Sequence, residues 1–280
     1  MINSLTRIIR RIALLIPGIL ISYFVASDLY PVLNNRIPVA PAVLIAYIAV
    51  AYFFIPAFMR LMKIIVRPKH IPHYCITSDG FASDPVNIGI VGTRRQLIKS
   101  MSKIGWHLAD KQNLVNVFRM GLSILSKTPY HNAPFSNLYL FGRKQDCGFQ
   151  MPIGNSPLKR HHVRFWAAAP SLSSTERSHL EFWQQHQPNK KQNKAQLWIG
   201  SASRDTGLGL IIHNAQLTHS VHPDTDSERN FIVDSLTKAN LIKKKQVVKI
   251  IDAYKLRNRV FRSHLSSDGK MTIITLKPKI

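Results

Sequence analysis

Two apolar runs without any charge occupy most of the first sixty residues and constrain the fold more than any other feature. They cover residues 12–27 and 37–59, and Asp28 interrupts the first one. A helix of roughly 20 apolar residues crosses the ~30 Å hydrocarbon core of a bilayer. We therefore expect a transmembrane helical hairpin with these boundaries: residues 1–70 overall, with spans at about 12–30 and 38–59.

The first run also fits a cleaved signal peptide. Basic residues precede it, and Val25, Ala26 and Ser27 resemble a cleavage site. The second run, however, starts within about ten residues of the first. Two apolar runs in such close succession favour the hairpin.

Basic residues outside the two runs predict their orientation, because cytoplasmic flanks carry an excess of Lys and Arg. The connection between the runs has only Arg36 beside Asp28. The outer flanks carry seven basic residues, namely Arg7, Arg10, Arg11, Arg60, Lys63, Arg67 and Lys69. Both termini are therefore expected in the cytoplasm.

The chain is strongly basic, with 38 Lys and Arg, 14 Asp and Glu, and a net charge of +24. Residues 1–70 hold 8 of the bases and 1 of the acids, which leaves 30 and 13, or +17, for the rest. Anionic phospholipid headgroups attract such an excess. Nucleic acid ranks below the bilayer as a partner, because no zinc finger or RNP aromatic motif is present.

The remainder is expected to be a tether at 71–83 and a soluble α+β domain at 84–280 with a largely antiparallel mixed sheet. Expected strands are 86–92, 138–141, 147–151, 161–168, 196–203, 209–213, 217–221, 247–254, 260–265 and 271–276. Expected helices are 93–103, 110–126, 175–187 and 226–239. Turns at 142–146 and 266–269 indicate two hairpins, and 188–194 is a polar loop.

Residues 160–166 form the first polar segment, Arg-His-His-Val-Arg-Phe-Trp. Alternation along a strand places Val163 and Phe165 on one face, which suits the core. The opposite face presents His162 between Arg160 and Arg164, a set that suits phosphate or carboxylate. The alternative is a cationic face exposed to water.

Residues 197–205 form the second polar segment and end in Arg204 and Asp205. Small residues at 200–203 allow a close approach of backbone, so a ligand could meet the strand end. Alternatively, Arg204 and Asp205 pair with each other and stabilise a hairpin turn. Ser201 and Ser203 do not lie in a GxSxG motif, which argues against a hydrolase nucleophile elbow.

Residues 218–229 form the third polar segment. Its His219, Asp224 and Asp226 are candidate ligands of a divalent metal. The spacing is not that of an EF-hand, because the sixth residue from Asp224 is Arg229 rather than Gly. Alternatively, Thr225-x-x-Glu228 is a capping box at a helix N-terminus. Among the cysteines, Cys147 is expected to be a buried structural thiol and Cys75 to lie in the tether.

In this order, the segments resemble the LssY C-terminal domain family. The matching stretches are DPVNIGIVG (84–92), GWHLAD (105–110), TPYHNAPFSNLYLFGRKQDCGFQ (128–150), RHHVRFW (160–166), LWIGSASRD (197–205) and THSVHPDTDSERNFIVDSL (218–236). The chain departs from the pattern at Cys147-Gly148 and at His222, and its 171–194 connection is longer. His219 is therefore a better candidate than His222 for a shared site.

The resemblance implies a bacterial protein of the inner (cytoplasmic) membrane. In similar proteins the domain can be fused to DedA-like membrane segments or to a PAP2-type lipid phosphatase. The founding member's locus is linked to type I secretion. No activity and no functional residue carries over from the family.

The leading hypothesis is a membrane-anchored cytoplasmic domain that binds an anionic, phosphate-bearing ligand, either lipid-linked or free, at the bilayer surface. Arg164 and Arg204 would grip the anion, with His162 as a third ligand-binding residue. His162 and His219 would orient it or exchange a proton. Asp205, Asp224 and Asp226 would position these groups or hold a cation.

Two alternatives stay open. The first is a metal-assisted phosphoester hydrolase with His162, His219 and Asp205 as catalytic candidates. Its cofactor would be a divalent metal on His219, Asp224 and Asp226. The second is a non-catalytic assembly module that binds other envelope proteins, which would present an apolar groove or patch.

Overall fold

The computed structural model describes residues 20, 23–50, 54, 73–78, 82–126, 128, 130–140, 143–154, 156–168, 195–210, 217–257 and 264–278. These residues fall into two compact units, one mainly before residue 67 and one made of nearly all residues after it. The predicted helix 175–187 and the polar loop 188–194 lie outside the described residues.

The N-terminal unit contains a helical hairpin. Its elements are the π-helix η1 (Val25–Leu29), α2 (Tyr30–Asn34) and α3 (Val39–Ala49). The rings of Phe24 and Phe54 meet edge-on at 5.9 Å, and α3 buries Ala42 and Ala46. Among the described residues, no helix combines the length and the apolar content that a membrane crossing needs. Both predicted spans extend beyond the described residues.

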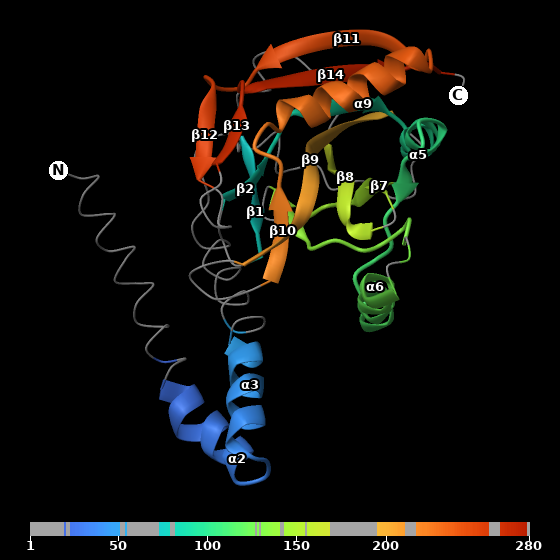
Figure 1. Ribbon diagram of the computed structural model, residues 1–280. Helices are drawn as coiled ribbons and strands as arrows, with labels where there is room; N and C mark the ends of the chain where they lie inside the picture. The colour runs from blue at the N-terminus through green and yellow to red at the C-terminus, as the bar shows by residue number, and fades with distance from the viewer. Residues whose placement is uncertain are drawn as a thin grey trace, which may run out of the picture. The chain divides into compact units, whose positions relative to one another are not determined.

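A large mixed sheet is the centre of the C-terminal unit (Figure 1). It contains β3 (Ile88–Gly92), β4 (His107–Leu108), β7 (Cys147–Ile153), β8 (Ser156–Ala168), β9 (Gln196–Leu210), β10 (Leu217–Val221), β11 (Ile242–Lys249) and β14 (Lys270–Leu276). The strand order is β11-β14-β3-β9-β8-β7-β4, and β10 pairs with β9. Only β14 and β3 run parallel among these pairs. The α+β class with a largely antiparallel mixed sheet is confirmed.

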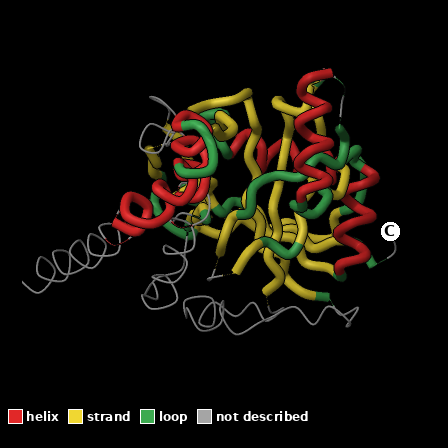
Figure 2. The backbone as a smooth tube through the Cα atoms, turned by 90° about the horizontal axis from the view of Figure 1, so that it is seen from below, coloured by secondary structure: helices red, strands yellow, loops and turns green. Residues whose placement is uncertain are grey.

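Helices α5 (Arg94–Lys103) and α9 (Asp226–Lys238) cover one face of this sheet. Thr93 and Gln96 form a capping box that starts α5. The packed core on this face contains Leu97, Met101, Phe165, Trp198, Ile232 and Leu236. In Figure 2 the strands (yellow) form the body of this unit, with helices (red) along its right-hand side.

A small second sheet packs against the other face. It contains β1 (Tyr74–Thr77), β2 (Ala82–Pro85), β5 (Leu138–Leu140) and β6 (Arg143–Lys144), in the order β2-β1-β5-β6. Cys75, Leu138 and Trp166 belong to the core between the two sheets. The expected tether at 71–83 therefore contains β1 and the start of β2, and Cys75 is fully buried.

Both predicted hairpins are wrong. β5 belongs to the small sheet, whereas β7 pairs with β8 and β4. β13 (His264–Ser267) pairs with β12 (Tyr254–Arg257), whereas β14 pairs with β11 and β3. At Gly269, φ is +70°, and a Cβ there would lie 2.2 Å from the Ile251 carbonyl. This glycine lets the chain cross between two sheets, a turn that local sequence cannot distinguish from a hairpin.

Two strand boundaries also differ from the expectation. The predicted strand 196–203 and the first two residues of the predicted strand 209–213 belong to one continuous strand, β9, with Arg204 and Asp205 inside it. Residues 211–213 lie outside the described residues. β11 covers Ile242–Lys249, so it overlaps the predicted strand 247–254 only at its last three residues. Because β11 is an edge strand with exposed lysines, its sequence lacks the apolar alternation of an inner strand.

Candidate functional site

Two neighbouring strands of the large sheet supply the base of the site. On β8, alternation places Arg160, His162 and Arg164 on the face toward the small sheet. The register pairs Arg160 with Asp205 and His162 with Ser203 on β9. The three β8 side chains are only 1–5% exposed. The alternative of a cationic face in water is therefore wrong, since this face is covered.

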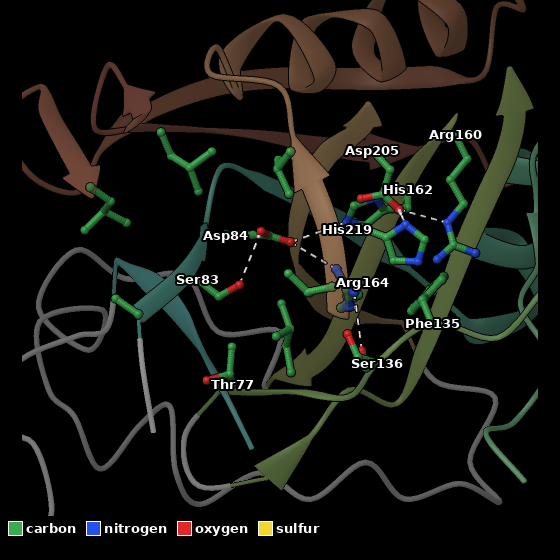
Figure 3. Close-up of a pocket in the computed structure, with 16 residues that line it drawn as sticks. Thr77, Ser83, Asp84, Phe135, Ser136, Arg160, His162, Arg164, Asp205 and His219 are labelled. Atoms are coloured by element: carbon green, nitrogen blue, oxygen red, sulfur yellow. Dashed lines mark hydrogen bonds and ion pairs between the residues drawn. The ribbon is translucent and has the colours of Figure 1, made fainter. Parts of the chain in front are cut away.

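Each arginine is paired with a buried carboxylate (Figure 3). Asp84 on β2 accepts a 3.0 Å hydrogen bond from Nη1 of Arg164. Asp205 accepts a 2.9 Å hydrogen bond from Nε of Arg160. Nη1 of Arg160 also donates to Gln150 at 2.8 Å. These bonds hold both guanidiniums in fixed positions between the two sheets.

Two histidines lie beside the same carboxylates. Nε2 of His162 is 3.2 Å from the Ser203 hydroxyl and 3.4 Å from Oδ2 of Asp84. Nδ1 of His162 is 3.4 Å from Oδ1 of Asp205. On β10, Nδ1 of His219 is 3.7 Å from Oδ2 of Asp205. The Asp205 carboxylate thus lies next to both imidazoles.

Phe135, in the loop before β5, covers the two arginines. Its ring centroid is 4.6 Å from the guanidinium carbon of Arg164 and 5.5 Å from that of Arg160. The ring lies against Gly148 on β7, where a Cβ would be only 2.2 Å from the Phe135 ring. The missing side chain at Gly148 therefore lets Phe135 pack as a lid over the cations.

The buried acids stay ionised. Burial opposes the charge of Asp84, but the hydrogen bond from His162 and the charge of Arg164 hold its pKa well below the usual range. Burial likewise opposes the charge of Asp205, yet His162, His219 and Arg160 together lower its pKa. Both carboxylates are therefore anions at neutral pH.

Burial lowers the pKa of the basic side chains, because it disfavours their charged, protonated form. It lowers the pKa of Arg164, an effect that the charges of Asp84 and Asp205 partly offset. Burial also lowers the pKa of His219, and the nearby Asp205 opposes this shift. His219 is therefore neutral at pH 7 and able to accept a proton.

The two arginines, the two histidines, Asp84, Asp205 and Phe135 line a cavity of about 80 Å³. Among the described residues, six enclosed side-chain nitrogen or oxygen atoms have no hydrogen-bond partner. Four of them belong to residues that line the cavity, namely Nη2 of Arg160, Nε of Arg164, Nδ1 of His162 and Nδ1 of His219. Both imidazole atoms still lie within 3.7 Å of the Asp205 carboxylate, whereas buried polar atoms without a hydrogen bond are rare and costly, so the two guanidinium atoms indicate a ligand site.

The structure does not bring Arg204 into this cluster. Its register partner is His161, on the opposite face of the sheet from His162. On that face, Nδ1 of His161 pairs with Glu228 of α9 at 2.8 Å. The sequence placed Arg204 at a strand end, whereas it lies inside β9, where alternation directs it away from the cavity.

Asp224 and Asp226 are engaged at the N-terminus of α9 instead of beside His219. The Asp224 carboxylate accepts hydrogen bonds from the backbone N–H groups of Asp226 and Ser227. Asp226 pairs with Arg229 at 3.2 Å and accepts the N–H of Asp268. Within the described ranges, no three His, Cys, Asp or Glu side chains are grouped as metal ligands. The expected convergence of His219, Asp224 and Asp226 is thus not found.

The predicted capping box is wrong as well. Thr225 makes no capping hydrogen bond, and its hydroxyl donates to the Ser266 carbonyl. Glu228 pairs with His161. Asp224 takes over the capping role because its side chain precedes the first turn and reaches two free N–H groups.

Two site residues, Asp84 and Phe135, are not among the candidates from the sequence, and Arg160 is named there only as a neighbour of His162 on the polar face. In the sequence, Asp84 stands only at the start of the matched stretch 84–92 and has no expected role. Its signal is an acid two residues before the expected buried strand 86–92 in a basic chain. Arg160 had a usable signal, because it alternates with His162 and Arg164. Phe135 had none, since only the fold brings its loop to β8.

Comparison with known proteins identifies the family. The chain matches the family described as LssY C-terminus over residues 68–271, which is more than half of its length. No curated protein and no solved structure matches the chain.

Proposed function

The chain belongs to the LssY C-terminus family, and we propose that its C-terminal domain binds a phosphate-bearing ligand in the Arg160–Arg164 cavity at a membrane surface. One observation carries this proposal. Nη2 of Arg160 and Nε of Arg164 are enclosed and have no hydrogen-bond partner among the described residues. A guanidinium N–H donor gains most from an anionic oxygen.

The size of the cavity limits what enters it. At about 80 Å³, it is smaller than the roughly 300–1,000 Å³ of sites that enclose a whole drug-sized ligand. A single tetrahedral headgroup fits this volume better than a complete nucleotide does. The rest of the ligand would therefore stay outside the cavity, as the tail of a lipid does.

The charge balance explains why the histidines matter. The charges of Arg160 and Arg164 offset those of Asp84 and Asp205, so these four side chains have no net charge. An anion that enters would favour a proton on His219, whose pKa burial lowers in the empty domain. Binding of an anion is thereby coupled to uptake of a proton.

Membrane attachment by the N-terminal unit has its own support. Two charge-free runs precede residue 60, and basic residues flank them. On α3 the large apolar side chains Val39, Val43, Leu44, Ile45 and Ile48 are 41–57% exposed. A helix that is apolar on every side suits lipid rather than water. The basic flanks favour a cytoplasmic position for the domain in a bacterial inner membrane.

The binding test uses the full chain in detergent. Thermal unfolding is followed with inorganic phosphate, sulfate or acetate at constant ionic strength, so that general screening is matched. We expect phosphate and sulfate to raise Tm, and acetate to do so far less. No response to any of the anions, together with no binding heat in calorimetry, would refute the proposal.

A matched pair of variants locates the effect. Arg160→Lys keeps the charge near Asp205 but removes Nη2, and should abolish the phosphate response. Arg204→Lys makes the same change on the opposite face and should keep it. Equal loss in both variants would mean that the response reports surface charge.

Attachment of the chain to the membrane is tested separately, because an anchored chain stays in the membrane pellet after a carbonate wash.

Hydrolysis of a phosphate monoester is a second candidate, favoured by one observation. The His219 side chain is 20% exposed, lies beside Asp205 and lines the same cavity as the two arginines. Such a base can exchange protons with a bound phosphate or with water. Release of phosphate from para-nitrophenyl phosphate or phosphatidic acid that is lost in His219→Gln would support turnover. Binding without turnover would leave the domain a receptor.

A further inference from the structure

Helix α6 (Leu114–Ser126) differs from the other helices of its unit because its apolar face is uncovered. Leu114, Phe118, Leu122 and Leu125 are 89%, 68%, 50% and 81% exposed. Their spacing of four, four and three residues places them on one face of the helix. The opposite face, which includes the buried Ser123, packs toward the domain. In Figure 1, α6 lies at the end of the unit away from β11 and α9.

The same unit buries its other apolar helix faces. Leu97 and Met101 of α5 and Ile232 and Leu236 of α9 have no exposed surface. Leaving a comparable stripe in water forfeits about 25 cal/mol per Å² of apolar area. Contiguous apolar patches of this kind mark contacts with proteins or with membranes.

Charge decides between these occupants. The 13 residues of α6 include no acid. Arg119 lies at the edge of the stripe and Lys111 precedes the helix, and both are exposed. An apolar stripe beside cations is the pattern of helices that lie in the interface of an anionic bilayer. A second copy of the chain would bring the same excess of positive charge, which opposes self-association.

A short segment of chain joins the second apolar run to the C-terminal domain. Only 14 residues separate Met59, at the end of the second apolar run, from Tyr74, at the start of β1. Fully extended, they reach at most about 50 Å. If the N-terminal unit anchors the chain, as proposed above, the domain is confined near lipid, and weak insertion of α6 becomes an intramolecular event.

We infer that α6 inserts its Leu114–Phe118–Leu122–Leu125 stripe into the headgroup region of an anionic bilayer. This inference rests on the anchoring part of the proposed function. It has a consequence for the cavity, because the loop after α6 carries Phe135. That loop is also joined to the site, since Gln150 donates to the His131 carbonyl at 2.7 Å and accepts from Arg160 at 2.8 Å. The loop that follows α6 thus contributes Phe135 to the lining of the cavity.

The test uses the full chain in lipid nanodiscs. An environment-sensitive NBD dye is attached to Leu122→Cys, or to Lys244→Cys on β11 as an exposed polar control. The native Cys75 and Cys147 are buried and stay unlabelled. With phosphatidylglycerol present, we expect blue-shifted emission at position 122 and quenching by lipids that carry a nitroxide on the acyl chain. The dye at position 244 should report water.

Three results would overturn the inference. These are water-like emission at position 122 in anionic nanodiscs, blue-shifted emission that acyl-chain nitroxides do not quench, and equal insertion into pure phosphatidylcholine. The second would indicate a protein partner on α6. A Phe118→Asp substitution should remove the blue shift and keep the Tm response to sulfate. Release of the chain by carbonate with intact quenching would refute the anchor but not α6.

Discussion

The guanidinium of Arg164 on β8 and the carboxylate of Asp84 on β2, 3.0 Å apart, join the large sheet to the small one. Their side chains are only 6% and 5% exposed. The pair therefore fixes one wall of the cavity and one position of the small sheet at the same time. A substitution that breaks this contact should therefore change both the cavity and the packing of the two sheets.

Removing one partner should be costly. Asp84→Ala leaves Arg164 as an uncompensated buried charge, which typically costs about 3–5 kcal/mol of stability. Urea unfolding of the full chain in detergent measures this loss. Asp252→Ala breaks the exposed pair with Lys249 and should leave the midpoint nearly unchanged, because solvent screens that pair. Equal effects of the two substitutions would contradict the structural role of Asp84.

Gly148 should tolerate no side chain. Gly148→Ala forces a Cβ against the Phe135 ring, and overpacking of this kind costs about 1–3 kcal/mol. The displaced ring should also weaken sulfate binding. At Gly121 in α6, nothing lies within 4 Å of an added Cβ, so Gly121→Ala should stabilise the helix by about 0.5–1 kcal/mol. The two unfolding curves should move in opposite directions.

Stability should fall in mild acid through His219. Burial lowers its pKa below the ordinary 6.5, so the unfolded chain takes up this proton first as the pH drops. The folded state then loses stability from about pH 6.5 downward until its own, lower pKa is reached. His219→Gln removes this contribution. Unfolding free energies from about pH 8 to pH 5 should decline more steeply in the wild-type chain, and parallel profiles would contradict the assignment.

Sulfate affinity should rise as pH falls. Sulfate itself does not titrate in this range, so the trend reports the protein. If one proton enters with the anion, affinity changes by up to about tenfold per pH unit above the pKa of the empty site. Calorimetry in buffers of different ionisation heat counts that proton. His219→Gln should flatten the profile, and a slope that this variant preserves would place the proton elsewhere.

Asp224 should behave as a helix cap. Asp224→Ala removes the acceptor for two N–H groups and should cost about 0.5–2 kcal/mol. Asp224→Asn keeps an acceptor oxygen and should cost less. The Tm increment from phosphate should stay the same in both variants. A selective loss of that increment would return Asp224 to the binding site.

The sequence predicts most elements of the domain where the pattern is local. Alternation on 160–166 correctly separates the core face with Val163 and Phe165 from the polar face with His162. Thr93 and the following residues correctly predict the start of α5. These features depend on neighbours within a few positions along the chain, so a single sequence contains them.

The rest of the site depends on pairing between distant segments. Asp84 reaches Arg164 only because the small sheet covers the large one, a contact across 80 positions. Arg204 is a site candidate in the sequence because it is expected at a strand end after small residues, whereas β9 continues past it and directs it to the other face. Asp224 was assigned to a metal because acids near a histidine fit both a ligand set and a cap. Only the direction of each side chain separates these alternatives.

The most direct test of the central claim is a crystal structure of the full chain grown with phosphate. We expect a phosphate in the cavity, within hydrogen-bond distance of Nη2 of Arg160 and Nε of Arg164, under the Phe135 ring. A cavity that contains only water at saturating phosphate, with both nitrogens bonded to that water, would contradict it.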